Sequence, residues 1–247
     1  MSLVFRVLLM LALAAPAAAA TTDRLNRTLP LASGAAVSLR VTNGHVQIAT
    51  WDRPELAIEI VRRAPDARLL ARITPVIDTT PDGVVIAVVQ PEGGRDPALR
   101  SDVVLRLPAT TTLREIDVFE GNIEVGGIMA ATSARVERGE ITMTRVSGAI
   151  RAETGMGAIR LERATLSPEG MIRLRTFNGN VTLDLAPRPA NARILALSMG
   201  GTIASDIPLT RRERWGPRWG EATLGTGEPV ISIDVVNGNI AITSGGS

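Results

Sequence analysis

The chain has 247 residues, a formal net charge of +2 and no cysteine, so it suits one domain of ordinary size and forms no disulfide bond. The sequence isoelectric point of 10.6 reflects the absence of lysine, tyrosine and cysteine, and the near-neutral charge balance excludes a basic nucleic-acid-binding stripe. Aromatic residues make up only 2% of the chain, which favours a thin core of stacked aliphatic side chains.

Residues 1–20 have the features of a secretory signal peptide. One basic residue, Arg6, precedes an apolar run over 7–15, and small residues continue to Ala20. We expect cleavage before Thr21 and an exported product, periplasmic or extracellular. A membrane anchor is the alternative, but the apolar run is too short to span a bilayer, and no later segment predicts a membrane span after leader cleavage.

Residues 21–115 predict an N-terminal β-rich part of the same domain. After a polar lead-in over 21–36, two short strands are expected within 37–48, joined at the turn signal Asn43-Gly44. Pro65-Asp66 opens one short helical turn. Alternation of apolar and polar residues predicts three further strands, at 56–61, 84–90 and 103–107. A Gly/Pro-rich loop over 91–97 separates the last two of them.

From residue 116 to the C-terminus one short phrase recurs, in which a glycine is followed by aliphatic residues alternating with polar ones. The first five of these glycines are 18, 18, 22 and 22 residues apart. A period near twenty predicts a solenoid, and the alternation predicts half-buried strands. We therefore expect an all-β, single-domain β-solenoid or β-helix-like stack over 116–247, with a β-sandwich as the alternative. The expected inner column is Ile123, Ile141, Ile159, Val181 and Ile203.

Each repeat is expected to turn at a glycine with positive φ, a conformation that costs other residues roughly 1–2 kcal/mol. The structural corners predicted in this way are Gly44, Gly121, Gly139, Gly148, Gly157, Gly179, Gly201 and Gly238.

Between Gly201 and Gly238 the step is 37 residues, and an insert loop is expected over 206–229. The insert is rich in arginine and tryptophan, which dominate the energetics of protein interfaces. It is therefore either a binding patch or a cap over the open end of the stack, and we favour the cap. The candidate patch comprises Arg211, Arg212, Arg214, Trp215, Arg218 and Trp219.

The sequence predicts no catalytic, cofactor-binding or metal-binding residue. There is no cysteine, and the one histidine, His45, lies beside a turn glycine, so neither a nucleophile with its base nor a zinc site is indicated. The alternative function is a carbohydrate-active enzyme that uses two surface carboxylates. Its candidate acids alternate with arginines, which favours charge pairs on a solvated face: Glu120, Glu124, Glu137, Glu140, Glu153 and Glu162.

Several short segments resemble the bacterial putative-adhesin family, exported proteins built around a domain of unknown function. The resemblance is carried by Val41–Ile48, Thr50–Arg53, Thr176–Val181 and Val235–Ile242, and it covers nearly all of the chain after the leader. It implies a β-solenoid at the cell envelope without known catalytic residues. The expected function is thus a non-catalytic, adhesin-like binding or structural module, whose partner would be an envelope protein or a glycan.

Overall fold

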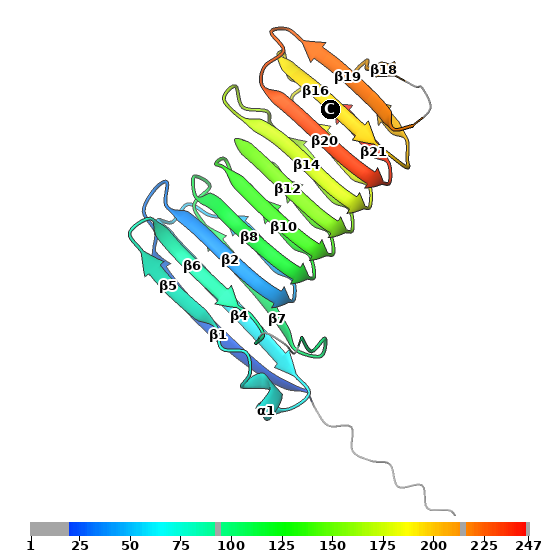
Figure 1. The fold of residues 1–247 in the computed structure, drawn as a ribbon. Helices are drawn as coiled ribbons and strands as arrows, with labels where there is room; N and C mark the ends of the chain where they lie inside the picture. The colour runs from blue at the N-terminus through cyan, green and yellow to red at the C-terminus, as the bar shows by residue number, and fades with distance from the viewer. Residues whose placement is uncertain (1–19, 92–94, 213–215, 246–247) are drawn as a thin grey trace, which may run out of the picture.

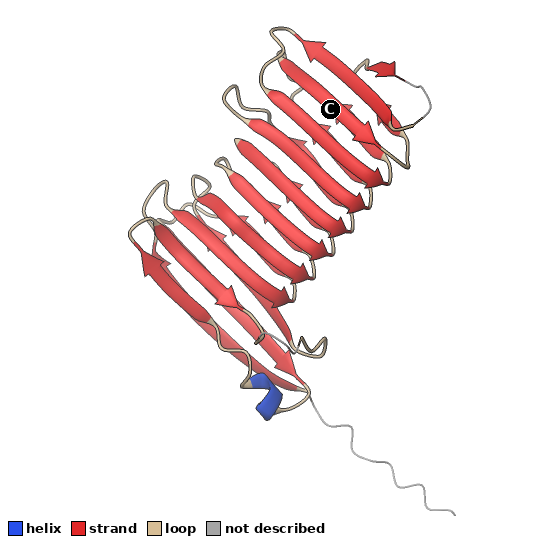
Figure 2. Ribbon diagram, viewed as in Figure 1, coloured by secondary structure: helices blue, strands red, loops and turns tan. Residues whose placement is uncertain are grey.

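The computed structural model describes residues 20–91, 95–212 and 216–245, and it confirms an all-β fold with one short helix (Figures 1 and 2). The expected leader, apart from Ala20, lies outside the described residues. The N-terminal elements are β1 (Thr21–Pro30), β2 (Ala36–Asn43), β3 (Val46–Thr50), β4 (Glu55–Ala64), α1 (Ala67–Leu70), β5 (Val76–Thr80), β6 (Gly83–Val88) and β7 (Arg100–Leu107). The central elements are β8 (Thr112–Glu120), β9 (Ile123–Gly126), β10 (Thr132–Arg138), β11 (Ile141–Thr144), β12 (Ala149–Met156), β13 (Ile159–Ala164), β14 (Met171–Asn178) and β15 (Val181–Leu185). The C-terminal elements are β16 (Ala192–Ser198), β17 (Ile203–Ser205), β18 (Thr210–Arg212), β19 (Arg218–Leu224), β20 (Val230–Asn237) and β21 (Ile240–Ser244).

The strands form two mixed sheets that enclose one hydrophobic core. The 10-stranded sheet has the order β1-β4-β7-β3-β9-β11-β13-β15-β21-β17. The 11-stranded sheet has the order β18-β19-β16-β20-β14-β12-β10-β8-β2-β6-β5. Figure 1 shows the strands of the second sheet side by side along the length of the molecule. Within the part of the chain that the structure describes, no helix has the length and hydropathy needed to cross a bilayer.

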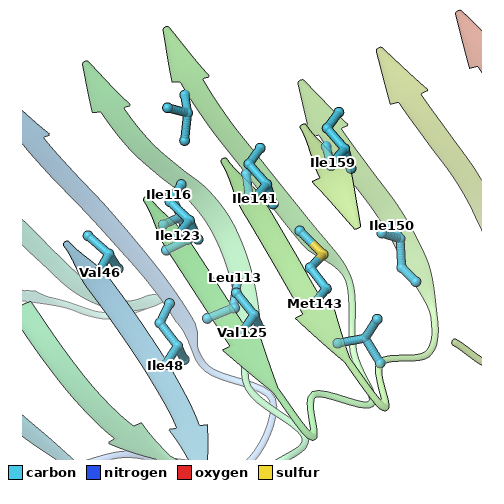
Figure 3. Close-up of a cluster of buried hydrophobic side chains, with 14 of the residues drawn as sticks. Val46, Ile48, Leu113, Ile116, Ile123, Val125, Ile141, Met143, Ile150 and Ile159 are labelled. Carbon is cyan, nitrogen blue, oxygen red and sulfur yellow. The ribbon is translucent and has the colours of Figure 1, made fainter. Parts of the chain in front are cut away.

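Between residues 112 and 185 the chain passes from one sheet to the other with every strand. Each strand pairs in parallel with the strand two places further on, so equivalent residues of successive repeats become neighbours. The register aligns Ile123, Ile141 and Ile159, as predicted, and Val181 follows Ile159 (Figure 3). All four side chains are fully buried, because the repeats on either side cover them.

The last repeat of the sequence is not the last repeat of the stack, and this corrects the expected inner column. Strand β20 lies between β14 and β16, and β21 lies between β15 and β17. Val181 therefore neighbours Ile240, and Ile240 neighbours Ile203, so Val181 and Ile203 are not adjacent. Asparagines hydrogen-bond across both new neighbours: Asn180 Oδ1 accepts the N–H of Asn239 at 2.9 Å, and Asn239 Oδ1 accepts that of Thr202 at 2.9 Å.

The predicted corner glycines, apart from Gly148, form one column along the stack. The main chain of each glycine fills the space in which a side chain on its neighbour would lie. A Cβ placed on Gly139 would lie 1.6 Å from the carbonyl oxygen of Gly121, and one on Gly157 would lie 1.9 Å from that of Gly139. Both glycines have φ of 143°. Gly201 is different: its φ lies outside the positive region expected for it, but a Cβ there would still lie 1.8 Å from the oxygen of Gly238.

Two edge strands occupy segments in which the sequence predicted no strand. Strand β1 pairs antiparallel with β4 from Thr21 to Pro30, within the segment expected to be a polar lead-in. Strand β5 pairs antiparallel with β6 and leaves most of its side chains exposed. An edge strand covers the core from one side only and needs few apolar residues, so its sequence pattern is weak. The helical turn was predicted correctly: α1 begins after Asp66, whose Oδ1 accepts the N–H of Leu69 at 2.7 Å.

Candidate binding face

The side chains that point away from the core on the 11-stranded sheet form a continuous surface, which we call the outer face. Burial alternates along each strand, as in β12, where Ile150, Ala152 and Thr154 are buried and the residues between them face outward. Eight consecutive strands of this sheet are parallel, in the order β6, β2, β8, β10, β12, β14, β20 and β16 (Figure 1). Their parallel register gathers outward residues of the same repeat position into straight rows.

One row of the outer face alternates in charge over six consecutive strands, and we call it the charge ladder. Its members are paired in register, each with the next, from β2 to β20: Arg40, Asp117, Arg135, Glu153, Arg175 and Asp234. The Arg135 side chain is 63% exposed, whereas that of Glu153 is 17% exposed and lies 3.9 Å from Arg135. Opposite charges on neighbouring strands stabilise a sheet and like charges destabilise it, so the alternation supports this strand order.

Asp117, the second member of the charge ladder, is a half-buried carboxyl group. Burial raises the pKa of Asp117 above its ordinary value, and the nearby Glu115 acts in the same direction. Arg135 and Arg40 on the neighbouring strands oppose this effect without cancelling it. The acid therefore binds its proton more tightly in the folded protein, and its contribution to stability decreases as the pH rises through its pKa.

A second row, next to the charge ladder, ends in three apolar side chains, of which Phe177 and Met199 are exposed and Val236 is half-buried. Phe177 follows the buried Thr176 of β14, Val236 lies beside it on β20, and Met199 directly follows β16. Phe177 is 56% exposed and Met199 57% exposed. We call these three residues the apolar row. A Cβ on Gly155, next to Phe177 on β12, would lie 2.7 Å from the main-chain oxygen of Glu137 and 3.1 Å from its carboxylate, so Glu137 occupies the space beside this glycine.

The apolar row and the charge ladder border a groove of about 550 Å³. Its lining includes all three residues of the apolar row together with Gly155 and four members of the ladder, Arg135, Glu153, Arg175 and Asp234. The groove thus combines apolar surface with arginine and carboxylate groups, which are able to form charge-assisted hydrogen bonds with a partner. Methionine, aromatic residues and arginine are the types enriched at protein interfaces.

The arginine- and tryptophan-rich segment expected to be an insert loop forms a β-hairpin at the end of the 11-stranded sheet. Strand β18 pairs antiparallel with β19, and β19 pairs with β16. Arg211 donates to the carbonyl oxygen of Ile203 at 3.3 Å, and Arg218 donates to that of Gly201. Both arginines thus bond to the main chain at the last strand of the other sheet, contacts of the kind a cap would make.

The other members of the candidate patch differ in how far the structure describes them. Trp219 pairs in register with Leu197 of β16, so it lies on the same side of the sheet as the groove. Arg212 belongs to β18, and its side chain lies outside the described residues. Arg214 and Trp215 lie outside them altogether. The sequence did not predict Phe177, Val236 and Met199 as site residues. Val236 lies beside Phe177 only because β20 is inserted between β14 and β16.

The six candidate acids of the enzyme hypothesis do not converge on one point. Glu137 and Glu153 lie on the outer face, whereas Glu124 and Glu162 lie on strands of the other sheet. Each has its own partner: Glu120 with Arg138 at 3.3 Å, Glu124 with His45 at 3.5 Å, Glu137 with Arg135 at 3.9 Å, Glu140 with Arg160 at 2.5 Å, Glu153 with Arg151 at 2.7 Å and Glu162 with Thr144 at 3.4 Å. This arrangement resembles charge pairs on a solvated sheet, the alternative stated from the sequence.

His45 lies half-exposed at the start of the stack, and its main-chain N–H donates to Asp102 Oδ1 at 3.0 Å. Burial raises the pKa of Asp102, but this N–H and the paired Arg63 guanidinium outweigh it and hold the pKa below the ordinary value of 3.8. A lowered pKa adds stability that is complete above the unfolded-state pKa and is lost as the pH falls through the folded-state pKa.

We therefore expect Asp102→Asn to lower the free energy of unfolding by about 1 kcal/mol at pH 7, with the difference from the unchanged protein shrinking as the pH falls below the ordinary pKa of 3.8. Urea denaturation between pH 2.5 and 7 measures it. The exposed Asp78→Asn is the control and should follow the unchanged protein at every pH. A constant difference across this range would contradict the role assigned to the Asp102 charge.

Comparison with known proteins places the chain beside several solved structures. No family model and no curated protein sequence matches it. It is similar to a putative cell adhesion protein from Clostridium sporogenes, with 10% identity and a TM-score of 0.46 over 91% of this chain and 100% of the other. It is also similar to a putative adhesin from Bacteroides fragilis, with 10% identity and a TM-score of 0.38 over 90% of this chain and 97% of the other.

A third similar structure is a putative lipid binding protein from Parabacteroides distasonis, with 8% identity and a TM-score of 0.27 over 89% of this chain and 96% of the other. The names of the first two structures are those of the family that the sequence resembles. At these identities, and with TM-scores below 0.5, the likenesses assign neither a ligand nor a role to the chain.

Proposed function

We propose that the chain is an exported, non-catalytic cell-envelope protein, a β-solenoid that acts as an adhesin-like binding module through its outer face. The observation that carries the proposal is the apolar row: the exposed Phe177 and Met199 and the half-buried Val236 lie together and line one groove on the outer face. Exposed apolar residues that are contiguous and bordered by polar groups mark interaction sites on soluble proteins. The envelope partner, a protein or a glycan, would bind in this groove.

The solenoid assignment draws on the parallel pairing of every second strand and on the column of close-packed glycines. Such a stack is rigid along its length and presents outward residues at the strand spacing of about 4.8 Å. Export draws on the leader, since strand β1 begins at Thr21, the residue before which cleavage is proposed. Removing residues 1–20 would therefore leave the antiparallel pair of β1 and β4 complete.

The function is tested by removing the apolar row while leaving the core unchanged. We expect Phe177→Ala with Met199→Ala to weaken binding at least ten-fold on a panel of immobilised glycans and envelope proteins, because exposed anchors dominate binding energy. The matched control replaces two exposed apolar residues away from the groove, Val76→Ala with Met129→Ala. Both pairs should melt like the unchanged protein, because exposed side chains contribute little to folding.

Equal binding by the two double variants would refute the groove as the binding site. The enzyme alternative has its own readout in the same panel, the release of glycan products. Turnover that is abolished by Glu120→Gln or Glu124→Gln would replace the binding module with the carbohydrate-active alternative.

A further inference from the structure

The charge ladder has a symmetry that the pairing of strands within one sheet does not require. It contains six members, beginning with the positive Arg40 and ending with the negative Asp234. Because the number is even and the signs alternate, the ladder read backwards is the opposite of the ladder read forwards. If two such ladders face each other in opposite directions, every arginine meets a carboxylate.

We propose that the partner of the outer face is a second copy of this chain, packed face to face with its stack reversed. This inference rests on the proposed function and names the partner of the same face. The two-fold axis would run parallel to the strands and pass between Arg135 and Glu153. Arg135 of each copy then faces Glu153 of the other, and Arg40 faces Asp234 of the other. An isologous contact of this kind repeats every interaction twice.

The rows on either side of the charge ladder fit the same axis. In the row to which Phe177 belongs, Phe119 of one copy faces Phe177 of the other. Phe119 already carries the Arg95 guanidinium, 3.6 Å from its ring centroid, and a guanidinium can stack on a second ring. In the row on the far side, Glu115, which accepts from Arg40 within its own chain, faces Arg173 of the other copy. The charge ladder is thus complementary along its whole length, and each flanking row adds one matched pair about the same axis.

The different heights of the side chains on the outer face also fit a second copy. Along the charge ladder the arginines project, as Arg135 does, and the acids are recessed, as Glu153 is. Projecting arginines of one copy can therefore reach recessed acids of the other across the spacing of about 10 Å between packed sheets. The same faces packed in the same direction would oppose arginine to arginine and acid to acid, so the charges select the reversed orientation.

The test uses the purified protein and a variant in which all six charges of the ladder are inverted: Arg40→Asp, Asp117→Arg, Arg135→Glu, Glu153→Arg, Arg175→Asp and Asp234→Arg. Alternation along the charge ladder is retained, but three ion pairs with neighbouring rows become like-charged: Arg40 with Glu115, Arg135 with Glu137 and Glu153 with Arg151. Circular dichroism therefore checks first that the variant folds. Sedimentation equilibrium should show dimers of the unchanged protein and dimers of the inverted variant. Mixing the two, one of them carrying a fluorescent label, should give no mixed dimers, because like charges then face each other throughout.

A monomer at every concentration up to about 0.2 mM, or free formation of mixed dimers, would overturn the proposal. If the inverted variant does not fold, Phe177→Ala in the unchanged ladder replaces it and should weaken the dimer at least ten-fold. Raising sodium chloride from 0.05 to 0.5 M should weaken the dimer by a similar factor. A monomeric protein whose panel binding still depends on Phe177 and Met199 would retain the proposed function and lose only this partner.

Discussion

Replacing Gly157 by alanine should lower the free energy of unfolding by about 3 kcal/mol or more, since it combines backbone strain with a steric overlap. The added Cβ would lie 1.9 Å from the carbonyl oxygen of Gly139, a main-chain atom that cannot rotate away. That oxygen also accepts the buried hydroxyl of Thr154 at 3.0 Å, so moving it breaks a second contact. Chemical denaturation monitored by circular dichroism measures the change.

Gly34→Ala is the matched control, because it separates strain from overlap. Gly34 has a positive φ of 77°, and a Cβ placed there would have no atom within 4 Å. Only the conformational cost remains, roughly 1–2 kcal/mol. If the two alanine variants lose equal stability, the close approach of the glycines in the column does not restrict the corner, and φ alone requires glycine there.

Ending the chain at Pro229 should unfold the C-terminal third of the stack. Strands β20 and β21 are removed from between partners on both sides, and with them five buried aliphatic residues: Ile231, Ile233, Val235, Ile240 and Ile242. Each contributes roughly 1.5–3 kcal/mol when covered, which together approaches the entire stability of a domain, about 5–15 kcal/mol. Hydrogen exchange should become fast in β14 and β16 and stay slow in β2, which lies far from the deletion.

The control for this deletion is a chain that ends at Gly245 and keeps both strands. Its hydrogen exchange and melting should match those of the full chain, since Gly245 still donates to the carbonyl oxygen of Leu185 at 3.0 Å. Slow exchange in β16 without β20 would mean that β16 pairs directly with β14. The inserted position of the last repeat would then be unnecessary for a stable stack.

Phe177 shows how much of the candidate site the sequence could predict. Its alternation with Thr176 places it on the outer face, and this much follows from a period of two along one strand. Its neighbour Val236 lies 59 residues away, and their contact depends on which repeats become neighbours. Periodicity is a property of each repeat and does not specify the order in which repeats stack, so neither the apolar row nor the last member of the charge ladder could be derived from it.

The sequence by itself determined the all-β class, the strands of the central repeats and the alignment of Ile123, Ile141 and Ile159. These follow from alternation and glycine spacing, which act over a few residues and through adjacent repeats. Only the tertiary structure decided that β20 and β21 enter between other strands, and that β18 and β19 pair within the segment expected to be a loop. Those choices depend on hydrogen bonds and charges between residues far apart in the chain, such as Asn180 with Asn239, because the free energy that selects them exists only once both partners are in place.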